Sequence, residues 1–194
     1  MRGWPNGCVD AVVTDPPYVG FGFTPQNYLE MMEPFAEEIL RCVGPSGRLA
    51  VSQPKARLST VRQMFDAGSV AEIKDAFSDH RGDSAFFLLR NPIPDRNPQV
   101  RQWSNIPGTI HPNPRDVNKM AALVELMSEP GDLILDPFCG SGATGLAAVL
   151  LGRNVVGIEL GEERALDANR RFEAIGAEPL SDVDWRRGRD SNPR

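Results

Sequence analysis

The chain has 194 residues, of which 41% are hydrophobic and 24% charged, and a formal net charge of −5 at pH 7. These values are ordinary for one soluble globular domain that is long enough to bury a real core. No apolar run approaches membrane-spanning length, and three cysteines without CxxC spacing argue against a disulfide framework or a zinc site. With only two histidines, we expect no metal centre, no membrane partner and a reducing cytoplasmic setting.

The first half of the chain alternates short apolar segments with segments of helical spacing. Four segments are short and rich in apolar or β-branched side chains, which predicts strands over residues 9–14, 48–52, 70–77 and 85–90. Residues 27–42 and 56–65 are expected to be helices. Because the turn-forming segment 78–83 joins the last two strands, we expect these strands to form an antiparallel hairpin.

The second half begins with residues 91–114, which are rich in proline and irregular and predict a long functional connection. The remainder predicts helices over 117–127, 143–151 and 162–175 and strands over 132–136 and 154–159. Such alternation of strand and helix predicts a parallel α/β sheet, which binds ligands at the carboxyl ends of its strands. We expect one domain over residues 1–180 and a disordered polar tail over residues 181–194.

Asp15, Pro16, Pro17 and Tyr18 directly follow the first expected strand. The prolines restrict the backbone and donate no N–H, so the segment is a stiff elbow carrying a carboxylate, carbonyls and an aromatic ring. The exocyclic amine of adenine or cytosine is a poor nucleophile, because its lone pair is delocalised. Hydrogen bonds to Asp15 and the Pro16 carbonyl would localise that lone pair, while Tyr18 stacks on the base. The alternative is a proline turn that only closes a strand.

A second motif, DPFCGSGATG over residues 136–145, joins a strand to a helix. Gly140 and Gly142 let the backbone approach a ligand closely, and the helix N-terminus offers unpaired N–H groups. Glu159, at the end of the next strand, can accept hydrogen bonds from ribose hydroxyls. Gly140, Gly142 and Gly145 also satisfy GxGxxG, the pattern of dinucleotide-binding folds. A nicotinamide dehydrogenase is therefore an alternative function, although it would not use the proline elbow. A glycine-rich turn used only for packing is the remaining alternative.

Together, these motifs resemble those of the amino-methylating DNA methyltransferases that use S-adenosylmethionine. Their order resembles the permuted group, in which the DPPY motif precedes the glycine-rich motif, and WSNIP at 103–107 leading to His111 and Pro112 adds to the likeness. The resemblance implies a doubly wound, Rossmann-like methyltransferase sheet that is mostly parallel, with an antiparallel edge hairpin. It implies methylation of an exocyclic amine in DNA, with N6 of adenine favoured, N4 of cytosine as the alternative and RNA as a weaker one.

Carried over residue by residue, the resemblance assigns the target base to the elbow, Asp15, Pro16, Pro17 and Tyr18. It assigns the cofactor to a second set, Asp136, Phe138, Gly140, Gly142, Glu159 and His111. We expect direct methyl transfer without a covalent enzyme intermediate, because no cysteine is visibly paired with a base. Three arginines are predicted to contact DNA, namely Arg90, Arg96 and Arg101.

The chain also departs from the family pattern. The family's segment after the histidine-proline pair ends in Lys-Pro, whereas Arg115 and Asp116 stand here, and either Arg115 or Lys119 is a candidate for the cofactor carboxylate. The recognition region is reduced to residues 91–101, so we expect weak, nearly sequence-blind DNA binding, or a homodimer or partner that supplies recognition. A strand before residue 9 is expected to be missing, so we expect the chain to be incomplete at its N-terminal end. This leaves open a degenerate cofactor-binding module without turnover.

Overall fold

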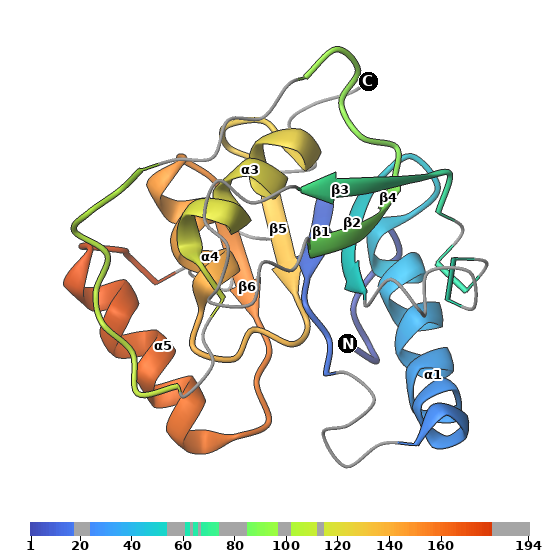
Figure 1. Ribbon diagram of the computed structural model, residues 1–194, viewed down its shortest axis with the longest axis horizontal. Helices are drawn as coiled ribbons and strands as arrows, with labels where there is room; N and C mark the ends of the chain where they lie inside the picture. The colour runs from blue at the N-terminus through green and yellow to red at the C-terminus, as the bar shows by residue number, and fades with distance from the viewer. Residues whose placement is uncertain are drawn as a thin grey trace.

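The computed structural model describes residues 1–17, 24–53, 61–62, 64–65, 67–73, 85–96, 102–111 and 115–179. These residues form a layered α/β structure in which helices pack against a six-stranded sheet (Figure 1). Within this part of the chain, no helix combines the length and the apolar character needed to span a lipid bilayer.

The sheet has the strand order β3–β4–β2–β1–β5–β6. Its strands are β1 (Ala11–Thr14), β2 (Arg48–Gln53), β3 (Ser69–Ile73), β4 (Ala85–Arg90), β5 (Leu133–Asp136) and β6 (Asn154–Gly157). The neighbours β2, β1, β5 and β6 are parallel, whereas β4 is antiparallel to both β2 and β3. The predicted mostly parallel sheet with an antiparallel edge hairpin is therefore confirmed. We call the edge at which the parallel strands end the carboxyl edge; it faces downward in Figure 1.

The helices with described bounds are α1 (Pro25–Val43), α3 (Val117–Met127), α4 (Ala143–Leu150) and α5 (Glu162–Ala174), each within two residues of its predicted range. α1 begins where Thr24 caps its first turn by accepting a hydrogen bond from the Asn27 N–H. It ends at Gly44, whose φ of 67° is left-handed and suits glycine. The helix predicted over 56–65 lies mostly outside the described residues, and residues 61 and 62 are helical.

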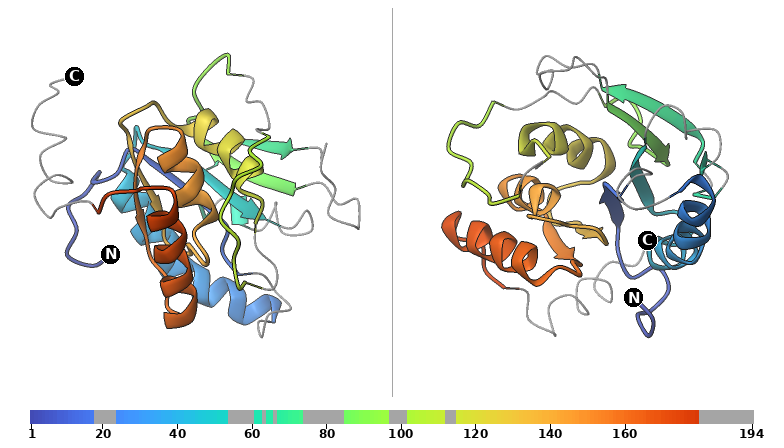
Figure 2. Two further views of the ribbon diagram at one scale, coloured as in Figure 1. Left: turned by 90° about the vertical axis from the view of Figure 1, so that its left-hand side faces the viewer. Right: turned by 60° about the horizontal axis from the view of Figure 1, so that its bottom comes forward.

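The central strands bury one core on each face of the sheet, because alternate side chains of a strand point to opposite faces. On one face α1 packs, through Tyr28, Met32 and Ile39, against Val12, Leu49 and Leu135. On the other face α3 and α4 pack, through Leu123 and Leu146, against Val13, Ala50 and Ile134. The right panel of Figure 2 shows α1 on one side of the sheet and α3, α4 and α5 on the other.

The predicted irregular connection over residues 91–114 contains no helix or strand in its described parts. It is held against the helical layer, because the Ile93 N–H donates to the Leu126 carbonyl and because Trp103 and Ile106 pack on the core beneath α3 and α4. The connection therefore runs along the folded domain and reaches the neighbourhood of α5. At the far side of the described sheet, the edge strand β6 has exposed or half-buried residues.

Candidate active site

The elbow after β1 and the glycine loop after β5 meet at the carboxyl edge, because β1 and β5 are parallel neighbours. A hydrogen bond of 2.6 Å joins them, donated by the Thr14 hydroxyl to Oδ1 of Asp136. Both residues are buried, with exposed fractions of 1% and 2%. Thr14 thus fixes the start of the glycine loop relative to the elbow. The sequence pattern marks Thr14 only as a strand residue, so this role was not predicted.

Asp136 is a buried carboxylate that accepts hydrogen bonds from three groups. Besides Thr14, the Thr144 hydroxyl and the Phe138 backbone N–H donate to it. Burial outweighs these bonds and raises the pKa of Asp136 to about 6, and the negative charge of Asp15 acts in the same direction. Asp136 therefore changes charge close to neutral pH, unlike an exposed carboxylate.

We expect replacement of Asp136 with asparagine to remove part of the pH dependence of folding. Because the folded pKa of about 6 lies above the ordinary 3.8, the folded chain keeps a proton that the unfolded chain releases. The wild-type free energy of unfolding therefore falls as the pH rises from about 4 to about 6, by about 3 kcal/mol from this group. Asp136→Asn stays neutral and lacks that fall, which urea denaturation at about pH 4.5 and about pH 7 measures. An equal fall in both proteins would contradict the assignment.

Asp15 lies one residue beyond β1 and pairs with an arginine that directly precedes the cap of α3. The Arg115 guanidinium donates through Nε to Oδ2 of Asp15 and through Nη2 to Oδ1, the second bond measuring 2.9 Å. Both side chains are partly exposed, 44% for Arg115 and 20% for Asp15. The next residue, Asp116, caps α3 by accepting from the Asn118 N–H, which anchors the backbone that carries Arg115.

The glycine loop contains two residues with left-handed backbone, Gly140 with a φ of 52° and Gly142 with a φ of 84°. A Cβ atom at Gly142 would lie 3.2 Å from Cβ of Ala168 and 3.3 Å from Cζ of Phe172, both on α5. A Cβ atom at Gly140 would have no heavy atom within 4 Å. The predicted close approach to a ligand therefore suits Gly140, whereas Gly142 is needed for packing and for its left-handed backbone.

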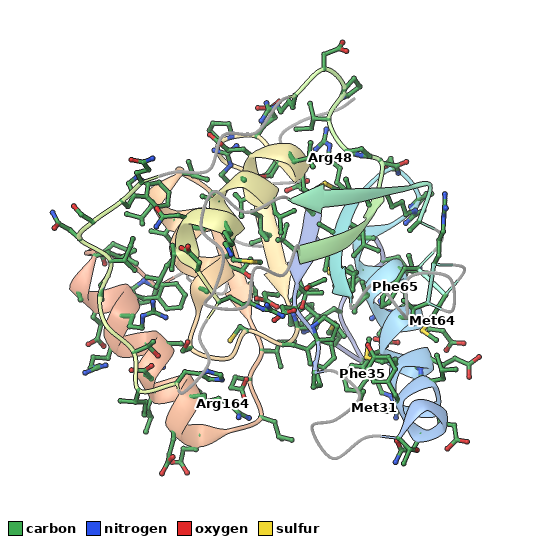
Figure 3. The ribbon with its side chains drawn as sticks, viewed as in Figure 1. Met31, Phe35, Arg48, Met64, Phe65 and Arg164 are labelled. Atoms are coloured by element: carbon green, nitrogen blue, oxygen red, sulfur yellow. The ribbon has the colours of Figure 1, made fainter. Side chains whose placement is uncertain are left out.

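Glu159 closes the glycine loop from two residues beyond β6. Its Oε2 accepts from the Gly140 N–H over 3.0 Å, and its Oε1 accepts from the Gly161 N–H over 2.7 Å. Arg164, at the start of α5 (Figure 3), pairs with Oε1 over 2.8 Å. Oε1 also accepts from the Arg164 Nε–H over 3.0 Å, and the Glu159 side chain is only 9% exposed. The carboxylate is therefore held in one orientation, and Oε2, which accepts one of the described bonds, keeps a lone pair for a ligand.

α5 ties the glycine loop to the irregular connection through two buried charged residues. The Arg171 guanidinium donates to the carbonyls of Pro107 and Ser141, one in the connection and one in the loop. Asp167 accepts from the Thr109 hydroxyl. An arginine and an aspartate on an amphipathic helix look like surface residues in the sequence, so neither role was predicted.

Phe138 and Cys139 complete the loop. The Phe138 ring packs on Phe35 of α1, with ring centroids 5.1 Å apart and ring planes tilted by 54°, and Figure 3 shows Phe35 on the face of α1 turned toward the sheet. Burial raises the pKa of the Cys139 thiol to about 12, with the charges of Asp136 and Glu159 acting in the same direction. Cys139 therefore stays protonated and is unsuited to act as a nucleophile.

The remaining predicted elbow and cofactor residues that the structure describes lie at or near the same edge. Directly after Asp15 in the sequence, Pro16 is buried and Pro17 is half-buried. The backbone N–H of His111 donates to the Thr109 hydroxyl over 3.0 Å, so α5 also positions His111. Tyr18 lies outside the described residues.

Arg90 and Arg96 are not brought to the carboxyl edge, so a DNA contact beside Asp15 is not supported for either. Arg90 ends β4, whose antiparallel direction carries it to the opposite edge, where its guanidinium donates to the Gly44 and Pro45 carbonyls. The guanidinium of Arg96 donates to carbonyls at the end of α3, which precedes β5 at that same opposite edge. The third predicted arginine, Arg101, lies outside the described residues.

Known proteins share both the sequence pattern and the fold. Residues 72–170 match the family model for N6 and N4 methyltransferases, described as DNA methylase. The "Putative methylase YubD" of Escherichia coli (strain K12) is 28% identical over 197 residues, covering 90% of this chain and 86% of YubD. The crystal structure of the M1.HpyAVI–SAM complex has a TM-score of 0.61 at 25% identity, covering 84% of this chain and 88% of that chain. The cytosine-N4-specific PvuII DNA methyltransferase has a TM-score of 0.69 at 16% identity, covering 97% and 86% of the two chains, a likeness of fold alone.

Proposed function

This chain belongs to the DNA methylase family of N6 and N4 amino methyltransferases, and we propose that it methylates N6 of adenine in DNA. The observation that carries the proposal is the hydrogen bond between Thr14 and Asp136, which joins the DPPY elbow to the glycine loop at one edge of the sheet. Transfer of a group between a base and a cofactor needs both sites in such fixed proximity. The preference for adenine rests on the family tendency of an elbow that begins with aspartate.

S-adenosylmethionine is the methyl donor of this family, and the glycine loop fits it. Gly140 offers open space where a side chain would stand, and Oε2 of the anchored Glu159 suits a ribose hydroxyl. When bound, the cofactor supplies an electrophilic methyl group on a sulfonium sulfur. The residues proposed to hold it are Asp136, Phe138, Gly140, Glu159 and His111, while Gly142 shapes the loop.

The elbow residues act on the target amine. We propose that Asp15 and the Pro16 carbonyl accept hydrogen bonds from its two N–H groups, which turns the nitrogen lone pair away from the ring. The negative charge of Asp15 then stabilises the positive charge that the amine gains. Tyr18 is proposed to stack on the base. Because the Cys139 thiol stays protonated, the glycine loop provides no thiolate for a covalent route.

The product of the reaction tests this proposal. Duplex DNA is incubated with the protein and methyl-labelled cofactor, digested to nucleosides and analysed by mass spectrometry. We expect label on N6-methyladenine. Label on N4-methylcytosine would contradict the choice of base but keep the family's chemistry, and an absence of label would favour a cofactor-binding module without turnover. Tight binding of NAD without binding of S-adenosylmethionine would favour the dehydrogenase alternative.

A further inference from the structure

The Arg115 guanidinium holds the carboxylate that the target amine needs. Its Nε and Nη2 groups engage both oxygens of Asp15, at the edge of the sheet where the elbow and the glycine loop meet. An incoming amine would have to share these oxygens with a cation. This pair joins residues that are 100 positions apart in the sequence, so it is a product of the fold.

A cation in this position opposes the proposed chemistry. The amine gains positive charge during methyl transfer, and an adjacent guanidinium repels that charge and neutralises Asp15. The paired arrangement therefore suits the DNA-free protein, and the reacting arrangement requires the Arg115 side chain to turn away from Asp15.

A DNA phosphate is the partner that best fits the displaced guanidinium. The planar fork of arginine matches phosphate as well as it matches carboxylate. The Arg115 side chain is 44% exposed, so its pair with Asp15 is screened by solvent and contributes little to stability, which makes exchange of partners easy. Its backbone stays anchored by the cap of α3 at Asp116, so only the side chain has to move.

On the basis of the proposed methylation of DNA, we propose that Arg115 binds a DNA phosphate. In the DNA-free protein, Arg115 pairs with Asp15 instead. Binding of DNA then frees the Asp15 carboxylate for the amine. Arg115 thereby takes the place that sequence reasoning gave to Arg90 and Arg96, whose guanidinium groups donate to backbone carbonyls at the opposite edge.

The salt dependence of DNA binding tests this assignment. Arg115→Ala, Arg115→Lys and the control Arg96→Ala are compared with the wild type by fluorescence anisotropy on a duplex, with turnover at saturating DNA and cofactor affinity by calorimetry. We expect Arg115→Ala to weaken binding and to reduce the slope of log affinity against log salt by about 1. Arg115→Lys keeps its charge, so its slope stays near that of the wild type, as does the slope of Arg96→Ala. In Arg115→Ala turnover at saturating DNA should rise, because the cation that competes with the amine for Asp15 is gone.

Other outcomes would overturn the assignment. An unchanged slope in Arg115→Ala refutes the phosphate contact. If turnover also falls at least about tenfold, Arg115 positions Asp15 instead, and if cofactor affinity is lost, Arg115 binds the cofactor. A reduced slope in Arg115→Ala without a rise in turnover refutes the release of Asp15. If Arg115→Ala fails to fold, Arg115→Gln replaces it. A wild type that binds DNA without methylating it refutes the proposed function, while the slopes still decide the phosphate contact.

Discussion

Replacing Asp15 with asparagine is expected to abolish methyl transfer while the fold and cofactor binding persist. Asparagine keeps the shape and one acceptor oxygen, but it has no charge to stabilise the positive charge on the amine. Its amide also presents N–H donors toward a group that itself donates. We expect kcat to fall by about 10²–10³-fold or more, measured as steady-state transfer of labelled methyl groups to duplex DNA.

Cofactor affinity distinguishes this loss from general damage. Calorimetry should give a dissociation constant close to that of the wild type, because the glycine loop is anchored by Thr14, Glu159 and Arg171 and not by Asp15. Loss of the partly exposed pair with Arg115 should change stability by at most about 1 kcal/mol. Asp95→Asn is the matched control, because Asp95 is exposed and has a φ of 57° that asparagine tolerates. Near-normal turnover in Asp15→Asn would refute the catalytic assignment.

An alanine at position 145 is expected to destabilise the chain, although alanine usually favours a helix over glycine by about 1 kcal/mol. Its Cβ would lie 2.5 Å from Cζ and 2.9 Å from Cε1 of Phe172. The Phe172 ring packs on the core beneath α3 and α4, so it cannot withdraw freely. We expect a loss of about 1–3 kcal/mol in the free energy of unfolding, measured by urea denaturation. Cofactor binding should weaken as well, because α5 anchors the glycine loop through Arg171.

A double-mutant cycle isolates the clash. In a Phe172→Leu background, the cost of Gly145→Ala should shrink or reverse, because the ring atoms are gone. Gly68→Ala serves as a control, since its Cβ would have no heavy atom within 4 Å. An equal cost of Gly145→Ala in both backgrounds would show that the contact with Phe172 is not the cause.

Local sequence determined the elements and the two motifs of this protein. Residues 117–127 form a helix with the predicted bounds, because the spacing of their apolar residues matches the helical period and Asp116 can cap the first turn. The β1 strand ends at Thr14, because two prolines close behind it cannot continue a ladder of hydrogen bonds. Such signals lie within a few residues of each other, so the sequence reveals them directly.

Only the tertiary structure decided which of these residues meet. Thr14 and Asp136 are 122 positions apart and Asp15 and Arg115 are 100 apart, and no local pattern encodes such pairs. The antiparallel direction of β4 sent Arg90 to the edge opposite Asp15, because the end of a strand at which a side chain lies depends on strand direction. The contact partners of a side chain depend on strand order and helix packing, which arise from burying both faces of the sheet at once.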